Sequence, residues 1–230
     1  MRSVAALAAT MSVALSAHAV PVTWEARGVI ESSTLDALFF ETFMPELAGT
    51  TAGDTFRLRI RFDTDAARND PVILPDGGRT RSFDATSLVM TLVVPGRGTH
   101  VFTIDRSVPT GTHSLIGIVD DQVVGDLVRD GVQFQHNYLT PEGVLLFQVF
   151  AAFFTADTSV IDDLCLPMTP DPQLGTGIER LLSIHANPPE LGDLSGLITS
   201  LVRVPEPGSL ALFAAGLCVL WAVRRQAAIA

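Results

Sequence analysis

The segment Thr55–Phe62 constrains the fold more than any other stretch in the body of the chain. Its apolar side chains, Phe56, Leu58, Ile60 and Phe62, alternate one by one with threonine or arginine. A period of two places all four apolar groups on one face of a β-strand, whereas a helix would scatter them around its circumference. Residues 55–62 are therefore predicted to form a half-buried strand with one apolar face and one cationic face.

Further apolar stretches of similar length are separated by turn residues. The connections are rich in Gly, Pro, Asp and Asn, as in Pro75–Gly78 and Pro95–Gly98, and these residues favour tight turns. Many short strands with a turn about every 10–15 residues are typical of an antiparallel β-sandwich. The sequence therefore predicts an all-β fold of jelly-roll or immunoglobulin-like type. The predicted strands are Val22–Ile30, Ser87–Val94, His100–Ile104, Ser114–Val119, Val132–Gln135, Val144–Phe154 and Ser195–Val204.

Three segments carry weaker patterns. Leu35–Phe43 has mixed apolar spacing and is predicted to be helical. Asp157 or Thr158 can cap a short helical turn through Leu164, since both residue types are good N-caps. Ile178–Ile184 fits either a helix or a strand.

The chain is strongly acidic. It carries 15 Arg and Lys residues against 25 Asp and Glu, which gives a formal net charge of −10. Such a chain repels nucleic acid, so no nucleic-acid partner is expected. Cys165 is the single cysteine of the body, and leucines and two acids surround it in the sequence. That setting does not favour a thiolate, so Cys165 is predicted to be a buried structural residue.

The C-terminal segment has three parts with distinct physical meanings. The two prolines of Val204-Pro205-Glu206-Pro207 fix φ and keep this stretch extended. An uncharged apolar run follows over residues 208–223, and the charges of Arg224 and Arg225 would stay on the cytoplasmic side of a membrane. The run has 16 residues, which span about 24 Å as a helix against a hydrocarbon core of about 30 Å. We predict a short transmembrane helix over 208–223, either a permanent anchor or a segment that is later removed.

These elements, in this order, resemble the PEP-CTERM sorting signal of Gram-negative bacteria. The resemblance rests on Val204-Pro205-Glu206-Pro207, on the apolar run, and on Arg224-Arg225, and it covers residues 204–230 only. It implies recognition by a membrane-embedded exosortase and cleavage near the Pro-Glu-Pro motif. It also implies passage through the inner membrane and export linked to exopolysaccharide or biofilm matrix.

The N-terminus predicts a secretory signal peptide. Met1-Arg2 is a short basic region, residues 4–15 are apolar, and Ala17-His18-Ala19 fits the A-x-A site that signal peptidase cleaves. The predicted organisation is a signal peptide over 1–19, an exported β-rich domain over 20–203, and the sorting signal over 204–230. A bitopic protein with an N-terminal membrane span is the competing interpretation.

Three acidic clusters offer oxygen ligands. Asp63, Asp65 and Asp70 are candidate calcium ligands, since closely spaced carboxylates suit this ion; a solvated turn that neutralises neighbouring arginines is the alternative. No other cofactor is expected. Paired carboxylates also serve glycoside hydrolysis, although adjacent acids on a strand face opposite ways. The other two clusters are Asp120, Asp121, Asp126 and Asp130, and Asp162 with Asp163.

The body contains no catalytic motif. Its four histidines lack a second His or Cys at metal-ligand spacing, and no Gly-x-Ser-x-Gly sequence is present. The sequence therefore predicts a non-enzymatic protein of the cell envelope or extracellular matrix, with a structural or polysaccharide-associated role. Two alternatives stay open. One is a secreted hydrolase acting on a glycan, and the other is a membrane-anchored ectodomain that is never processed.

Overall fold

The computed structural model describes residues 21–205 except 65, 105–111, 162 and 168. Within these residues the chain consists mainly of β-strands, with a short α-helix, α2 (Ala37–Phe43), and two 3₁₀ turns, η1 (Pro45–Leu47) and η2 (Pro189–Leu191). The strands are β1 (Pro21–Ser33), β2 (Thr55–Asp63), β3 (Ala67–Arg68), β4 (Val72–Ile73), β5 (Arg79–Asp84), β6 (Val89–Val94), β7 (Gly98–Phe102), β8 (Thr112–Val124), β9 (Leu127–Leu139), β10 (Leu145–Thr155), β11 (Glu179–Ala186) and β12 (Asp193–Val204).

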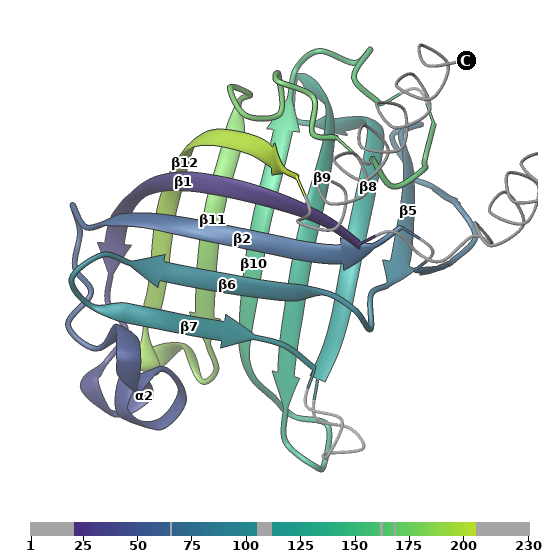
Figure 1. Ribbon diagram of the computed structural model, residues 1–230. Coiled ribbons are helices and arrows are strands. Elements are labelled where there is room, and N and C mark those ends of the chain that lie inside the picture. Colours follow the sequence, from purple (N-terminus) through teal and green to yellow (C-terminus); the bar gives the residue numbers. More distant parts are fainter. Residues whose placement is uncertain (1–20, 65, 105–111, 162, 168, 206–230) are drawn as a thin grey trace, which may run out of the picture.

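The described strands join one antiparallel sheet that curls back on itself. Its order is β3-β5-β8-β9-β10-β11-β12-β1-β2-β6-β7, and β4 also pairs with β5. One layer, formed by β1, β2, β6 and β7, crosses the layer formed by β8, β9, β10 and β11 at a steep angle (Figure 1). The predicted antiparallel all-β fold is confirmed, and its two layers come from one continuous sheet rather than from two separate ones.

The turn from one layer to the other occurs in β1 and β12. β11 pairs with β12 only from Asp193 to Leu197, and β2 pairs with β1 only from Pro21 to Val29. The register between β1 and β12 shifts between Arg27 and Gly28 and again between Ile30 and Ser32. Bulges of this kind bend a strand and let it pass from one layer to the next.

The bend depends on two glycines, Gly28 on β1 and Gly196 on β12, that lie close to the same ring. A methyl group at Gly28 would overlap the Leu197 carbonyl oxygen and lie 2.6 Å from Cζ of Phe56. A methyl group at Gly196, on β12, would lie 2.7 Å from Cε1 of the same ring. Only residues without a Cβ allow both strands to approach Phe56 this closely.

The core fills the space between the two layers. The alternation predicted for β2 is confirmed, since Phe56, Leu58, Ile60 and Phe62 are all at most 3% exposed. Trp24 on β1 is fully buried and meets three phenylalanine rings in edge-to-face geometry, an arrangement that aromatic rings favour. The three rings belong to Phe62, Phe134 and Phe153.

Non-sheet segments cover both open ends of the curl (Figure 1). At one end Asp36 caps α2 by accepting the Phe39 N–H at 2.6 Å. The ring of Phe39 then packs on Phe147 at 5.4 Å between centroids. At the other end the segment 156–178 buries apolar side chains in the same core, namely Ile161, Leu164 and Leu174.

Several sequence predictions differ from the structure in detail. The predicted helix over 35–43 is confirmed as α2, and the ambiguous Ile178–Ile184 is strand β11. Residues 157–164 form no helix where they are described; Asp157 Oδ1 instead accepts the Ser159 N–H at 3.0 Å in a local turn. Strands β8 and β9 are 13 residues each, far longer than predicted, and β5 was not predicted.

Substituting Gly28→Ala should destabilise the domain by about 1–3 kcal/mol, because the new methyl group enters occupied space between two strands and a ring. The measurement is the free energy of urea unfolding. Ser200→Ala, opposite Arg27 in the same strand pair, is the control and should change stability by less than about 0.5 kcal/mol. Equal stability of Gly28→Ala and the unmodified protein would contradict the account of the bend.

Candidate functional site

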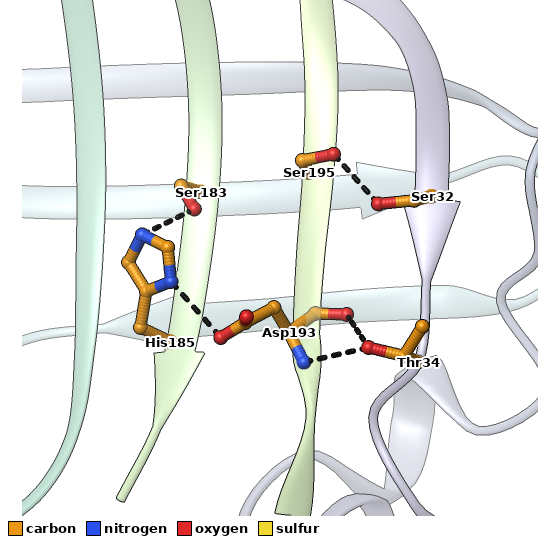
Figure 2. Close-up of polar contacts among 6 residues, drawn as sticks. All are labelled: Ser32, Thr34, Ser183, His185, Asp193 and Ser195. Atoms are coloured by element: carbon orange, nitrogen blue, oxygen red, sulfur yellow. Dashed lines mark hydrogen bonds and ion pairs between the residues drawn. The ribbon is translucent and has the colours of Figure 1, made fainter. Parts of the chain in front are cut away.

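A row of polar side chains crosses the outer face of β11, β12 and β1 (Figure 2). Ser183 Oγ lies 2.8 Å from Nε2 of His185, and Nδ1 of His185 lies 2.9 Å from Oδ1 of Asp193. The register places His185 directly opposite Asp193, with Ser183 two residues away on the same face. The order hydroxyl, imidazole, carboxylate is the hydrogen-bond order of nucleophilic hydrolases.

The row continues into β1 and ties three strands together. The hydroxyls of Ser195 and Ser32 lie 2.8 Å apart. Thr34 Oγ1 donates to the Asp193 carbonyl oxygen at 3.1 Å and accepts the Asp193 N–H at 3.0 Å. Cross-strand contacts of this type stabilise sheet pairing.

The serine–histidine–aspartate array provides only part of what acyl transfer requires. Ser183 is 4% exposed, and it is paired on one side with Phe150 and on the other with Ser195. Backbone N–H groups in the middle of a sheet bond to neighbouring strands, so they are not free to form an oxyanion hole. The array can orient a proton on His185, and it does not place donors where negative charge would develop.

The two ends of the described chain lie side by side. The register between β1 and β12 places Val204 opposite Thr23, and Pro205, which is exposed, follows directly. Segments before Pro21 and after Pro205 therefore join the domain at the same end of the sheet. The predicted signal cleavage residues Ala17 and Ala19, the sorting residues Glu206 and Pro207, and the basic pair Arg224 and Arg225 lie outside the described residues.

A family model of the PEP-CTERM protein-sorting motif matches residues 203–226. The chain carries a PEP-CTERM sorting motif. The matched range contains Val204-Pro205-Glu206-Pro207, the apolar run and Arg224-Arg225, on which the sequence-based resemblance rests. The motif marks the chain as an exported protein that an exosortase sorts. Comparisons with curated proteins and with solved structures find no match.

The membrane segment of the PEP-CTERM signal stays a prediction. In the part of the chain that the structure describes, no helix is long and apolar enough to cross a membrane. The predicted span, residues 208–223, falls outside that part.

The predicted calcium loop is only partly described. Asp63 is the half-buried last residue of β2, and its backbone N–H donates to Ser87 Oγ at 3.0 Å. Asp70 is exposed, and β3, which pairs with β5, lies between the two. Asp65 lies outside the described residues, so calcium binding here stays a prediction.

The structure does bring together part of the second acidic cluster. Carboxylate oxygens of Asp120, Asp121 and Asp130 lie within 4.8 Å of one another at the bulge between β8 and β9, whereas Asp126 is exposed in the turn that joins these strands. Three close carboxylates are chemically suited to a hard cation. The register shift after Val119 places these side chains together, and sequence spacing alone did not single out the three.

The buried oxygens of this cluster already have protein partners. Asp130 is fully buried, and its two oxygens accept N–H bonds from Asp121 and Ile161, both at 2.9 Å. Asp120 is buried and forms an ion pair with Arg79. Burial raises the pKa of Asp130 above its usual value, the charges of Asp120 and Asp121 add to this, and the two N–H donors oppose it. In this arrangement the carboxylate of Asp130 holds the bulge and the segment around Ile161 in place.

A second histidine pair lies inside the core. His136 on β9 is fully buried, with Nδ1 2.5 Å from Ser114 Oγ and with Nε2 lacking a hydrogen-bond partner in the described structure. Burial lowers the pKa of His136 to about 4, because the charged imidazolium would lose its hydration. The imidazole is therefore neutral at physiological pH. Sequence analysis gave no signal for this pair, because Ser114 and His136 meet only through the β8–β9 register.

The prediction for Cys165 is wrong. The cysteine is exposed, whereas its neighbour Leu164 is buried in the core. The backbone N–H of Cys165 donates to Oδ1 of Asp163 at 3.0 Å, which directs the chain through a local turn. The apolar neighbours correctly indicate a packed segment, but only the leucine points inward.

Asp130→Ala should cost about 1–3 kcal/mol of unfolding free energy, because it leaves the N–H groups of Asp121 and Ile161 without their acceptor. Asp126→Ala, an exposed acid in the same hairpin, is the matched control and should have little effect. Urea unfolding at pH 7 measures both variants. Equal stabilities of the two variants would argue against the structural role of Asp130.

His136 should make the domain less stable in mild acid. The unfolded chain binds the proton first, near pH 6.5, and the folded state binds it only near pH 4. Stability contributed by this group is therefore lost as pH falls from about 6.5 towards 4, and amounts to about 2 kcal/mol between pH 7 and pH 5. Urea unfolding at both pH values, of the unmodified protein and of the Ser114→Ala/His136→Leu double variant, measures the part of the pH dependence that comes from His136. If the double variant loses as much stability between pH 7 and pH 5 as the unmodified protein, the assignment to His136 is contradicted.

Proposed function

We propose that this is an exported, non-catalytic protein of the cell envelope or extracellular matrix, with a structural or polysaccharide-associated role. The observation that carries the proposal is the PEP-CTERM motif at residues 203–226. In this proposal signal peptidase removes residues 1–19, an exosortase cleaves near Pro205-Glu206-Pro207, and the β-rich domain reaches the cell surface or the medium of a Gram-negative cell.

The positions of the chain ends support this route. Val204 is the last residue of β12, and the exposed Pro205 follows it directly. Cleavage after this point would leave every hydrogen-bonded pair of β12 with β1 and β11 in place. The released domain would therefore keep its complete sheet and its core.

The acidic charge suits a domain that stays dispersed after release. The full chain has a formal net charge of −10, and removal of Arg2, Arg224, Arg225 and Glu206 with the two ends would leave −12 on the domain. This charge keeps copies of the domain apart and weakens adsorption to anionic lipid. The same charge argues against nucleic acid as a partner.

A secreted hydrolase is the second candidate, and one observation favours it. The array of Ser183, His185 and Asp193 has the hydrogen-bond order of a serine hydrolase. A fluorophosphonate probe that labels the chain and fails to label Ser183→Ala would favour the enzyme. Labelling that is absent, or equal in both chains, would favour the non-catalytic role.

Intact-mass analysis of the protein from membrane and medium tests the route. We expect a mature species that begins at Val20 and ends near Pro205, without Arg224 and Arg225. A chain that retains Arg224 and Arg225 in every fraction would instead support the membrane-anchored ectodomain and would contradict exosortase release.

Glu206→Ala should block this maturation and leave the precursor in the membrane fraction, because it removes the single charge of the Pro-Glu-Pro motif. Glu190→Ala is the matched control, since Pro189-Glu190 repeats part of the motif in the exposed turn η2. Immunoblots of membrane and medium fractions compare the two. Normal release of the Glu206→Ala chain would count against recognition of the motif.

A further inference from the structure

A groove lies on the outer face of the sheet, where β1 bends. It has a volume of about 480 Å³ and runs beside the bulge at Gly28, with the ring of Phe56 at its base. Two arginines, two threonines and aliphatic side chains line it, among them Arg27, Arg57, Thr55, Thr199, Val29 and Val93. The groove lies where β1 and β12 change register, between outward-facing side chains of β1, β2, β6 and β12.

The groove concentrates positive charge on an acidic chain. Arg27 and Arg57 are direct cross-strand partners on β1 and β2, so their side chains leave the same face next to each other. Like charges in this position repel and destabilise the pair. An anion between them would turn this repulsion into attraction.

A single carboxylate serves the neighbouring arginines. Glu25 is 4% exposed. Its carboxylate accepts hydrogen bonds from Nη2 of Arg27 at 2.8 Å and from Nε of Arg59 at 2.9 Å. Burial raises the pKa of Glu25, but the hydrogen bonds and charges of Arg59 and Arg27 outweigh burial and lower it, so the carboxylate stays ionised. Its charge is therefore already shared between these two side chains.

Arg57 has no carboxylate partner among the described residues. Among the described residues no ion pair reaches Arg57 or Arg61, and Nε of Arg57 is buried without a hydrogen-bond partner. A buried guanidinium N–H without an acceptor is costly, so a ligand oxygen that draws the Arg57 guanidinium outward would relieve that cost. The guanidinium fork suits the two oxygens of a carboxylate or the several oxygens of a sulfate.

We propose that this groove binds an anionic polysaccharide, with Arg57 and Arg27 holding an acidic group of one sugar residue. The proposal rests on the exported, matrix-associated role proposed above, since that role would bring the domain into contact with glycans. Thr55 and Thr199 supply hydroxyls of the kind that bond to sugar hydroxyls. Val29, which is 37% exposed, and Val93 offer apolar surface for the C–H face of a sugar ring.

The geometry favours a glycan over other polyanions. The groove is open, has hydroxyl and aliphatic walls, and lies well along β1 from the end where Thr23 pairs with Val204. A ligand can therefore reach it while the chain is still attached at that end. Each sugar unit makes few contacts, so binding strength would come from several domains or several units along one polymer.

The test uses the purified full-length chain in mild detergent with immobilised glycans at low salt. We expect binding to polygalacturonate or to dextran sulfate, none to neutral dextran, and loss of binding as sodium chloride rises. The two anionic probes distinguish carboxylate from sulfate recognition, and binding to either supports the proposal. Absence of binding to both overturns it, as does preferential binding to poly-glutamate, which would indicate an acidic peptide ligand.

Arg57→Gln should weaken glycan binding by about tenfold or more, since it removes a charge-assisted, bidentate contact. Arg68→Gln is the matched control: Arg68 is exposed on β3, far along the sheet order from β2, and loses the same charge. Arg27→Gln provides a second, more exposed variant if Arg57→Gln fails to fold by circular dichroism. Equal loss in the Arg68 variant, or no loss in both groove variants, overturns the proposal.

Fractionation of producing cells separates this inference from the proposed function. A chain that is released and found in the matrix, but does not bind either anionic glycan, would overturn the groove assignment and leave the exported role intact. A chain that retains Arg224-Arg225 in every fraction would overturn the route of release whatever the glycan assay gives.

Discussion

The close approach of β1 and β12 over the ring of Phe56 is the contact on which the rest of the structure depends. Glycine at positions 28 and 196 lets two strands pass above one phenylalanine, and the bulge beside Gly28 turns the sheet from one layer into the other. Without this bend the apolar faces of β2 and β10 would lie on one open sheet and face solvent. With it, they close on Trp24 and on the rings around it.

A cationic groove lies on the outer face of the sheet beside the same bend. The groove is lined by Arg27 of β1 and by Arg57, which belongs to the cationic outer face of β2. Strand pairing then sets Arg57 beside Arg27, while Glu25 is already occupied by Arg27 and Arg59. The fold thus produces both the recess and its uncompensated charge.

Local patterns in the sequence predicted what depends on near neighbours. The alternation in Thr55–Phe62 identified β2 and its buried face, and the C-terminal residues identified the sorting motif, because each is defined within a short stretch. Contacts set by strand register could not be predicted: Ser114 meets His136, and Ser183 aligns with His185 and Asp193, only once strands pair in a particular phase. The acidic cluster combines both cases. Its members are visible in the sequence, but the bulge after Val119 decides that Asp130 joins Asp120 and that Asp126 does not.

The neighbouring positions of the first and last strands also set the order in which the domain can form. β12 lies in the interior of the sheet. On one side of it are β11, β10, β9, β8, β5 and β3, and on the other side are β1, β2, β6 and β7. Until residues 193–204 have crossed the membrane, the chain holds two half-sheets whose apolar faces lack their connecting strand. Completion of the fold therefore waits for the segment directly before the sorting motif. A membrane-held C-terminus would keep that last strand beside its partners at the moment when they must pair.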